Sequence, residues 1–445
     1  MRHARAIDRT PDVPSQAPRA AQPRIAIVGA GIAGLSAAHA LAPHARVDLI
    51  EAAPRLGGHA RTVVAGKCGD QPVDTGFIVF NEVNYPNLVT LFREIDAPVA
   101  PSDMSFAASF GNGALEYSLQ TADTMFAQRS NLLKPRFLRM VRDIFRFNSR
   151  AADLATDEGL PLGQFLDRMG MSRAFRDWYL GPISGAIWST PARDVMEFPA
   201  AAMLRFFRNH HLLSHTGQHQ WFTVQGGSVA YVSRLETRLK QAGVRIRTGA
   251  PVVAVERPEE GGARLRPQSS AWEEYDHVIL ATHADVSRRL LTDADPREAA
   301  LLGAIRFQSN RAVLHADDRL MPKRRKVWAS WNYAEPDGAR PDRIGLTYWM
   351  NRLQPIPEDD PLFVTLNPQM APRDDLIHDE TEFRHPVYDL AMMAAVEDLK
   401  AGNGARDTWF AGAWMRYGFH EDGMASGLDA AEGIRARRAM ALAAE

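Results

Sequence analysis

The chain has 445 residues, of which 45% are hydrophobic and 24% charged, so it is long enough for two or three globular domains with substantial cores. Its 52 basic and 53 acidic side chains nearly cancel, which excludes the overall positive field of a nucleic-acid-binding protein. Cys68 is the single cysteine, which excludes an intrachain disulfide and a cysteine-based metal cage and favours a reducing compartment.

Residues 1–22 predict a disordered leader, because they are rich in Pro, Ala and Arg and lack the apolar run of a signal peptide. No later segment approaches the roughly 20 apolar residues needed to cross a bilayer. We therefore expect a cytoplasmic protein. A peripheral association with the inner face of the membrane remains open.

The segment 24–41 predicts a strand at Arg24–Val28, a tight turn and a helix over Leu35–Leu41, in the order of a dinucleotide-binding motif. Gly29, Gly31 and Gly34 have the spacing GxGxxG. The first would make the turn, the second would leave room for a pyrophosphate, and the third would let helix and strand approach. The free N–H groups of the helix N-terminus would face the phosphates. Candidate cofactor residues here are Gly29, Ala30, Gly31, Ile32, Ala33 and Gly34.

A second glycine turn follows the next predicted strand, Val47–Ile50. That strand ends at Glu51, whose carboxylate would accept hydrogen bonds from both ribose hydroxyls and repel a phosphorylated ribose. The pair Gly57–Gly58 lies among cationic neighbours and would bring further N–H donors and positive charge to the same pyrophosphate. NAD sites do not usually need this turn. Candidate cofactor residues here are Glu51, Ala52, Arg55, Gly57, Gly58, His59, Arg61 and Thr62.

The stretch EAAPRLGGHARTV, residues 51–63, resembles the FAD-binding amine oxidase superfamily, which includes monoamine and polyamine oxidases, protoporphyrinogen oxidase and the carotenoid desaturases. In the motif E-A-x-x-R-x-G-G-R-x-x-T, His59 replaces the second arginine, and Arg61 could supply that phosphate contact. Segments 73–80, 223–256, 275–284 and 408–434 resemble the superfamily in the same order. The resemblance implies bound FAD and further contacts at Gly76, Phe77, Val252, Thr282, Gly412, Asp422, Gly423 and Met424.

The implied fold class is α/β, with a doubly wound Rossmann-like FAD-binding domain and a discontinuous mixed sheet-and-helix substrate domain. Residues 23–80, 220–285 and 405–445 would form the FAD domain, and residues 81–219 and 286–404 the substrate domain. The last helix is expected to begin near Gly423. By resemblance its positive end would face the N1 and O2 edge of the flavin and stabilise the reduced form.

The electrons are expected to come from the substrate, because no second GxGxxG is present for NAD(P)H. This favours an oxidase, dehydrogenase or desaturase over a monooxygenase. Amine oxidases generally carry a lysine in the strand after the Ala-Thr segment, and the comparable stretch 304–318 has none. Amine oxidation is therefore the weaker candidate.

The candidate catalytic residues lie just before the predicted flavin-facing helix. His420 could act as a general base near neutral pH, or Glu421 could do so if burial raised its pKa. Tyr417 could form part of a cage beside the flavin. The alternative is that this segment only forms hydrogen bonds to flavin and loop.

Segments 74–88, 186–191, 310–315, 328–333 and 417–423 resemble a bacterial subgroup of flavoproteins found beside cyclopropane-fatty-acid-synthase-like methyltransferases. That resemblance implies an FAD-dependent dehydrogenation or desaturation of a lipid acyl chain, in particular an unsaturated or methyl-branched fatty acyl group of a phospholipid. A flavin amine oxidase is the first alternative. A flavoprotein that assists a lipid methyltransferase without redox chemistry is the second.

An amphipathic helix is predicted over residues 131–150, with Phe137, Val141, Ile144 and Phe145 on one face and Arg139, Arg142, Arg146 and Arg150 on another. It could lie on anionic lipid with its apolar face down. The pattern favours the alternative, in which the apolar face packs on the core. Nearby, His210, His211, His215 and His219 are interrupted by Gly217 and lack an accompanying carboxylate, so we predict loop or helix-end histidines and no metal.

Overall fold

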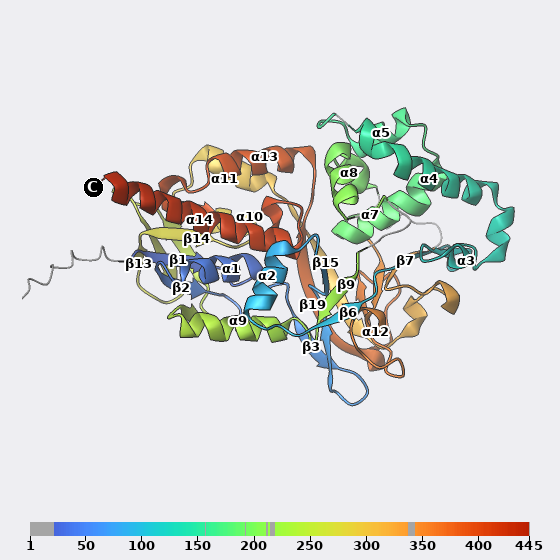
Figure 1. Ribbon diagram of the computed structural model, residues 1–445, viewed down its shortest axis with the longest axis horizontal. Helices are drawn as coiled ribbons and strands as arrows, with labels where there is room; N and C mark the ends of the chain where they lie inside the picture. Colours follow the sequence, from blue (N-terminus) through green and yellow to red (C-terminus); the bar gives the residue numbers. More distant parts are fainter. Residues whose placement is uncertain are drawn as a thin grey trace, which may run out of the picture.

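The computed structural model describes residues 22–155, 157–191, 193–210, 212–213, 219–336 and 343–444. The molecule is elongated, and a half built on a parallel sheet, with the C-terminus, lies beside a half built on a larger sheet (Figure 1). Nearly all of the predicted leader, together with His211 and His215, falls outside these described residues. None of the helices in the described ranges is long and apolar enough to cross a membrane.

A five-stranded parallel sheet forms the first half, in the order β10-β2-β1-β14-β20. Its strands are β1 (Arg24–Val28), β2 (Arg46–Ile50), β10 (Arg245–Arg247), β14 (His277–Leu280) and β20 (Thr408–Phe410). The strands come from three distant parts of the chain, as the sequence predicts for a Rossmann-like domain. Their carboxyl ends meet at one edge, where such folds bind nucleotides.

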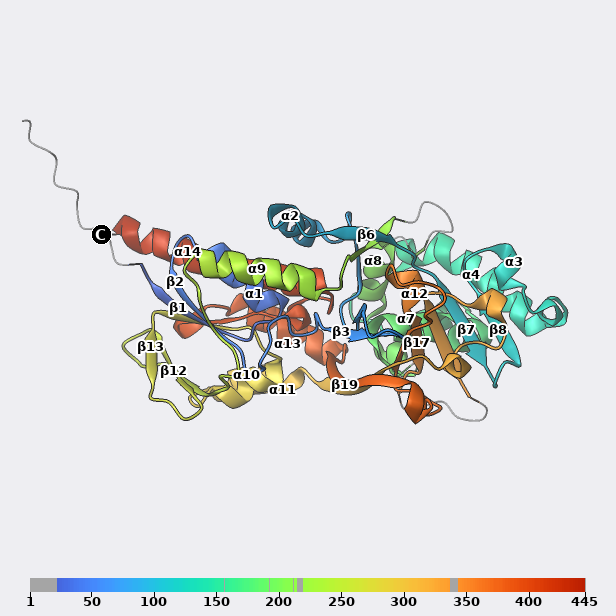
Figure 2. The ribbon, with the colours of Figure 1, turned by 90° about the horizontal axis from the view of Figure 1, so that it is seen from below.

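Both faces of the parallel sheet are covered, which is why its strands are almost continuously apolar. Ile25 and Ile27 of β1 face a core with α1 (Ile32–Leu41), α9 (Val229–Gln241) and α14 (His420–Ala444). Ala26 and Val28 face the opposite core. That side holds β11 (Val252–Glu256), β12 (Ala263–Pro267), β13 (Glu273–Tyr275), α10 (Ala284–Leu290), α11 (Pro296–Ala304) and α13 (Leu390–Ala401). Figure 2 shows α9 and α14 on one side of the sheet and α10 and α11 on the other. Part of the segments 286–404 assigned to the substrate domain thus lies with this sheet.

A seven-stranded sheet forms the second half, in the order β19-β15-β18-β17-β16-β7-β8. Its strands are β7 (Phe106–Phe110), β8 (Leu115–Ser118), β15 (Phe307–His315), β16 (Trp331–Glu335), β17 (Leu346–Trp349), β18 (Phe363–Leu366) and β19 (Ile377–Pro386), and α12 (Met350–Leu353) connects two of them. All pairs are antiparallel except β7 with β16. This mixed sheet agrees with the predicted substrate domain.

Short elements join the two halves. A two-stranded sheet pairs β3 (Thr62–Ala65) with β4 (Gln71–Asp74), and a three-stranded sheet has the order β5-β9-β6. The strands of the three-stranded sheet are β5 (Val79–Asn81), β6 (Val99–Ser102) and β9 (Trp221–Val224). In the chain, α2 (Pro86–Glu94) connects β5 to β6.

Helices cover the end of the molecule farthest from the parallel sheet (Figure 1). They are α3 (Ala122–Met125), α4 (Pro135–Leu154), α5 (Leu162–Arg168), α6 (Arg173–Phe175), α7 (Gly181–Trp188) and α8 (Ala200–Asn209). As predicted, α4 packs on the core, through Phe137 and Ile144. The assignment of Phe145 to that apolar face is wrong: Phe145 is 56% exposed, because it lies two turns after the exposed Leu138 on the same helical stripe.

The two helices of the nucleotide motif begin earlier than predicted. The helix α1 starts at Ile32 rather than Leu35, since the Leu35 N–H already donates to the Gly31 carbonyl at 2.9 Å. The helix α14 starts at His420 and not near Gly423. Asp422 accepts the N–H of Phe419 at 2.9 Å, the reciprocal bond of a helix cap, and this fixes the earlier start.

Candidate functional site

The first glycine turn leaves a cradle at the carboxyl end of β1. Gly29 has φ +100°, and a Cβ there would lie 2.5 Å from the Ala281 carbonyl oxygen, so glycine is required. A Cβ on Gly31 would instead meet no atom within 4 Å. Gly31 is the N-cap of α1, which has no side-chain cap and no acidic residue in its first turn. An open space before uncapped helical N–H groups fits a pyrophosphate.

Glycines also allow α14 to pack directly on α1. A Cβ on Gly427 of α14 would lie 2.1 Å from the Ala33 carbonyl oxygen of α1. Gly34 instead lets α1 pack on its own glycine turn, where a Cβ would lie 1.9 Å from the Gly29 carbonyl oxygen. Gly423 contacts Ile32, where a Cβ would approach to 2.8 Å. The Met424 carbonyl accepts the Ser36 hydroxyl at 3.1 Å. The first turn of α14 therefore lies beside the first glycine turn, as the resemblance implies for Gly423 and Met424.

The second glycine turn lies against the first. The Gly57 N–H donates to the Ala30 carbonyl at 2.8 Å, and a Cβ on Gly58 would come within 3.0 Å of Gly31 Cα. The Arg55 guanidinium donates to the carbonyls of Leu56, Gly58 and Ala60. Arg55 thus holds the turn in shape, and the two glycine turns the sequence predicts for one pyrophosphate come together in space.

Glu51 lies at the end of β2, next to the first glycine turn. Its carboxylate accepts the N–H groups of Ala30 at 2.7 Å and Ala53 at 2.8 Å. The segment before β11, which leads to Val252, runs alongside: the Ala250 N–H donates to the Glu51 carbonyl at 2.9 Å. Because Ala30 donates to Glu51, the N–H groups left for an anion are those after Ala30.

Arg61 and Thr62 have other partners than the predicted cofactor. The Arg61 guanidinium forms a two-point ion pair with Asp379 of β19, at 2.7 and 3.0 Å, so its charge is already neutralised. The Thr62 hydroxyl donates to Asp74 at 2.7 Å. In this structure they tie the second glycine turn to neighbouring strands, and Arg61 does not replace the arginine that is missing at His59.

A buried carboxylate anchors the segment that carries Gly76 and Phe77. Asp74 accepts the N–H of Ser228 at 2.8 Å and its hydroxyl at 2.7 Å. Burial raises the pKa of Asp74 to about 6, while the bonds from Thr62 and Ser228 oppose the rise. A Cβ on Gly76 would lie 2.0 Å from the His59 carbonyl oxygen, and the Phe77 N–H donates to the same oxygen at 2.9 Å.

Three histidines from distant parts of the chain meet beside this segment. His59 lies 5.9 Å from His283, which follows β14, and 5.6 Å from His385 of β19, between ring centroids. Burial lowers the pKa of His59 and of His283 to about 4 and that of His385 to about 3. All three rings are therefore neutral at physiological pH.

The tautomer of His385 is fixed by a chain of amides. Asn367 donates its amide Nδ2 to Asn310 Oδ1 at 2.8 Å, so Asn310 presents its own Nδ2 to His385 Nδ1 at 2.9 Å. His385 Nδ1 must accept, and its proton lies on Nε2. This leaves Nε2–H as the single donor of that ring.

His420 lies in an aromatic contact and not in a solvated base position. Its ring stacks on Phe77 at 3.9 Å with an interplanar angle of 11°, and its Nε2 is 2.7 Å from the Tyr231 hydroxyl. Burial lowers the pKa of His420 to about 3, with a smaller contribution from His59. The expectation of a general base titrating near neutral pH is therefore corrected: at pH 7 this imidazole is uncharged, and its ring and Nε2 are already engaged by Phe77 and Tyr231.

The other two candidate catalytic residues point elsewhere. The Glu421 carboxylate accepts the N–H groups of Asn87 at 2.9 Å and Leu88 at 3.0 Å and the Asn87 side-chain amide at 2.7 Å. It caps α2, whose N-cap residue Tyr85 supplies no side-chain bond. Tyr417 is 37% exposed and interacts with Arg205. The three candidate residues are close together in the chain, but their side chains point to different parts of the structure.

Glu421 therefore offers a direct test of the general-base hypothesis. We expect Glu421→Ala to lower the free energy of unfolding by about 1–2 kcal/mol, because α2 loses its cap. Glu421→Gln keeps one acceptor oxygen and should cost less. Urea unfolding measures both changes. Neither variant should slow flavin reduction in protein that remains folded, whereas a general base would lose most of its rate in Glu421→Gln.

Residues that follow β20 lie at the carboxyl edge of the parallel sheet, next to the first glycine turn. The Trp414 indole donates to the Thr282 carbonyl at 2.9 Å, and the Gly412 N–H donates to the Ser426 hydroxyl at 2.8 Å. Burial raises the pKa of Asp422 to about 6. Thr282 and Gly412 thus lie where β14 and β20 end, beside the predicted cofactor edge.

Sequence reasoning missed several residues of this region. His283 directly follows the predicted Ala-Thr segment, a signal that was available. Phe383, 5.0 Å from His59 between ring centroids, and His385 carry no local signal, because they lie on an ordinary-looking strand. Tyr388 is buried, and its hydroxyl has no hydrogen-bond partner within the described residues. A free buried phenol so close to Gly418 is a polar group available to a ligand.

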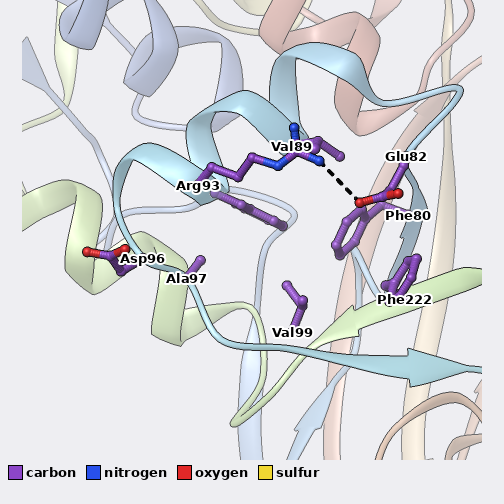
Figure 3. Close-up of a pocket in the computed structure, with 9 residues that line it drawn as sticks. Phe80, Glu82, Val89, Arg93, Asp96, Ala97, Val99 and Phe222 are labelled. Atoms are coloured by element: carbon purple, nitrogen blue, oxygen red, sulfur yellow. Dashed lines mark hydrogen bonds and ion pairs between the residues drawn. The ribbon is translucent and has the colours of Figure 1, made fainter.

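A cavity of about 440 Å³ opens between α2 and the β5-β9-β6 sheet (Figure 3). Its wall is mostly apolar, with Phe80, Phe92 and Phe222, and Arg93 and Glu82 pair across it at 3.3 Å. Phe92 lies 5.1 Å from Tyr231, the partner of His420. The cavity therefore does not lie at the glycine turns. Tyr231 separates its wall from the stacked rings of His420 and Phe77.

Comparisons with known proteins agree with this geometry. A model of the flavin containing amine oxidoreductase family matches residues 32–358. A curated relative, carotenoid phi-ring synthase of Streptomyces griseus, is 30% identical over 288 residues, which are 60% of this chain. The chain matches about half of that relative's length, 54%.

Solved structures share the fold across almost the whole chain. A protein from Exiguobacterium sp. 255-15 assigned as a protoporphyrinogen oxidase has a TM-score of 0.70 at 17% identity, covering 94% of this chain and 99% of its own. The CLA-producing fatty acid isomerase from P. acnes has a TM-score of 0.64 at 17% identity, with coverages of 92% and 97%. Cyclohexylamine oxidase from Brevibacterium oxydans IH-35A has 0.64 at 15%, with coverages of 93% and 99%.

Proposed function

The chain belongs to the flavin-containing amine oxidoreductase family and is an FAD-dependent oxidoreductase, and from this premise we propose that it removes two electrons from a lipid acyl chain. The substrate is an unsaturated or methyl-branched fatty acyl group of a phospholipid. Such an oxidation takes a hydride from one carbon and a proton from its neighbour and leaves a carbon–carbon double bond. Bound FAD would supply the electron acceptor, and the chain's own residues would provide the remaining functions.

The two glycine turns and the N-terminus of α1 would hold the cofactor. Gly31 and the helical N–H groups after it would receive the pyrophosphate, and Gly57–Gly58 lie against the same place. Glu51 would take the ribose, and the segment Gly76–Phe77 and the first turn of α14 would contact the flavin.

The observation that carries the choice of substrate is the uncharged wall around Phe77. His59, His283, His385 and His420 all have pKa values that burial lowers to about 3 or 4. Aromatic rings lie against two of them, since Phe77 stacks on His420 and Phe307 stacks on His283 at 4.4 Å. The charge of Arg384, which lies over Phe307, is neutralised by Asp285 at 3.0 Å. A wall of neutral imidazoles and aromatic rings suits an apolar chain better than an ammonium group.

The remaining functions fall to histidines, aromatic residues and the cavity near Phe77. The proton from the neighbouring carbon is assigned to His59, an uncharged imidazole whose backbone carbonyl accepts the Phe77 N–H and lies against Gly76, with His283 at 5.9 Å between ring centroids. His420 orients Phe77 through the ring stack, and Tyr231 holds His420 in place. The apolar cavity behind Phe92 offers room for part of an acyl chain. Burial of the site keeps water from the reacting carbons.

Anaerobic mixing of FAD-loaded protein with detergent-dispersed phospholipid tests the proposal. We expect the absorbance maximum of the flavin to bleach, and the recovered acyl chain to be lighter by two hydrogen atoms. Bleaching by primary amines but not by phospholipid would favour amine oxidation, which the related cyclohexylamine oxidase structure keeps as an alternative. Bleaching by neither would favour a non-redox partner of a lipid methyltransferase. Either of these two results would overturn the proposal.

A further inference from the structure

We propose that the face formed by the turn Arg129–Leu133 and the outer side of α4 docks on an anionic phospholipid bilayer. We call it the η1–α4 face. It exposes four large apolar side chains: Leu132 at 48%, Leu133 at 85%, Leu138 at 42% and Phe145 at 56%. Both views place α4 at the end of the molecule farthest from the parallel sheet (Figures 1 and 2).

The exposed apolar residues are not needed for the core. The buried stripe of α4 already consists of Phe137, Met140, Ile144 and Phe147. Leu138 and Phe145 lie seven residues apart, on one stripe of the opposite side. This helix therefore has two apolar stripes, one inside and one outside. An outer apolar stripe at the tip of a molecule is a typical feature of an interaction surface.

A row of arginines flanks the outer stripe. Arg139, Arg142 and Arg146 follow one another at spacings of three and four residues, so they lie side by side along the helix. Arg139, Arg146 and Arg150 pair with no carboxylate in the described part of the chain. Arg142 is 3.3 Å from the buried Asp143, which also accepts the Ser172 N–H at 3.0 Å. The positive charge of Arg139, Arg146 and Arg150 is therefore available to a partner, whereas that of Arg142 is shared with Asp143.

A cavity continues this charged row toward α5. It measures about 310 Å³ and is lined by Arg146, Arg150 and Arg168 together with the apolar Leu154, Leu160, Phe165 and Met169. The one carboxylate in its wall, Asp157, accepts the Gly159 N–H at 3.0 Å. Three guanidinium groups above apolar side chains match a phosphate carried on an acyl glycerol.

An anionic bilayer fits these observations better than a protein partner. Apolar side chains can enter the acyl boundary while the adjacent arginines remain at the phosphates. A second copy docked by a two-fold axis would bring the arginine rows toward each other, at a cost in repulsion. The chain as a whole carries a net charge of −1, so the attraction must come from this face. The inference does not depend on which substrate the flavin oxidises.

Vesicle flotation of the FAD-loaded protein tests the η1–α4 face. Vesicles of equimolar phosphatidylglycerol and phosphatidylcholine should bind the protein, and binding should weaken with added salt and in pure phosphatidylcholine. Arg139→Gln, Arg146→Gln and Arg150→Gln together should lower the partition coefficient by roughly 100-fold at low salt. Leu132→Ser, Leu133→Ser and Phe145→Ser together should weaken binding that persists at high salt.

Matched variants on the other half of the molecule serve as controls. Arg289→Gln, Arg297→Gln and Arg435→Gln remove the same charge, and Val253→Ser, Met440→Ser and Leu442→Ser remove three other exposed apolar groups. These should leave binding unchanged. Bound FAD per chain confirms that each variant is folded. If the wild type does not float, if both sets act equally, or if the face variants instead abolish self-association in light scattering, the inference is wrong.

Failure of the docking inference is distinguishable from failure of the proposed function. The flavin-reduction experiment uses detergent-dispersed lipid and needs no bilayer. A face variant that reduces its flavin normally but does not float would support docking as a separate property.

Discussion

Gly31→Asp is expected to abolish FAD binding while leaving the protein folded. A Cβ at Gly31 would meet no atom within 4 Å, and the backbone φ of −72° suits any residue. The aspartate would cap α1, which has no cap now, and raise the stability of the cofactor-free protein by a few tenths of a kcal/mol to about 1 kcal/mol. The same carboxylate would occupy the pyrophosphate space with like charge. We expect FAD affinity to fall by roughly 100-fold or more.

Flavin absorbance per chain after purification, with FAD titration by fluorescence quenching, measures the loss. Urea unfolding of the cofactor-free protein measures the stability. Gly31→Ala should show a smaller loss of affinity and an unchanged fold. Gly34→Ala is the contrasting control, because its Cβ would lie 1.9 Å from the Gly29 carbonyl oxygen, so fold and cofactor should be lost together. A yellow Gly31→Asp protein would contradict the cofactor site described here.

Acid should destabilise the protein between about pH 6.5 and pH 4. The imidazoles of His59, His283, His385 and His420 have pKa values that burial lowers to about 3 or 4. In the unfolded chain they take up protons near pH 6.5. Between these values the unfolded chain binds more protons, so lowering the pH favours unfolding. Their stabilisation is complete above about pH 6.5 and is lost as the pH falls.

Two carboxylates oppose this trend. Burial raises the pKa of Asp74 and of Asp422 to about 6, so between about pH 6 and pH 4 the folded protein binds their protons more readily than the unfolded chain does. Burial also lowers the pKa of His210 and of His315 to about 4. Six imidazoles outweigh two carboxylates, and we expect a net loss of at least ~3 kcal/mol over the window.

Urea titrations at about pH 7.5, 6 and 4.5 measure this loss of stability. His420→Gln, whose amide can still bond to Tyr231, should show a shallower dependence by about one proton. A midpoint that stays constant or rises toward acid would show that these histidines are charged in the folded protein.

The nucleotide half could be predicted from sequence because its signals are local. Gly29, Gly31 and Gly34 follow a strand directly, and their roles depend on backbone space within a few residues. The parallel strands β1 and β2 were found within one residue of their observed bounds for the same reason. The start of α14 was not, because the Asp422 to Phe419 cap is a side-chain bond that no periodicity records.

The roles of the candidate catalytic residues could not be predicted from local signals. His420 and Glu421 are neighbours in the chain, yet one stacks on Phe77 and the other caps α2. Successive helical residues point about 100° apart, so adjacency in sequence does not place two side chains in one site. Phe145 is exposed for the same reason, because it follows the buried Ile144 directly and points about 100° away from it.

By itself, the sequence determined the cofactor class, the Rossmann-like order of strand, turn and helix, and the lack of a lysine in β15, since each depends on residue identity at short spacing. Only the tertiary structure decided the rest. It brought His59, His283 and His385 together from three segments, made their rings neutral by burial, and left Leu133 and the arginines of α4 facing outward. Burial and long-range contact are properties of the packed chain, and these set both the pKa of a side chain and the surface that it faces.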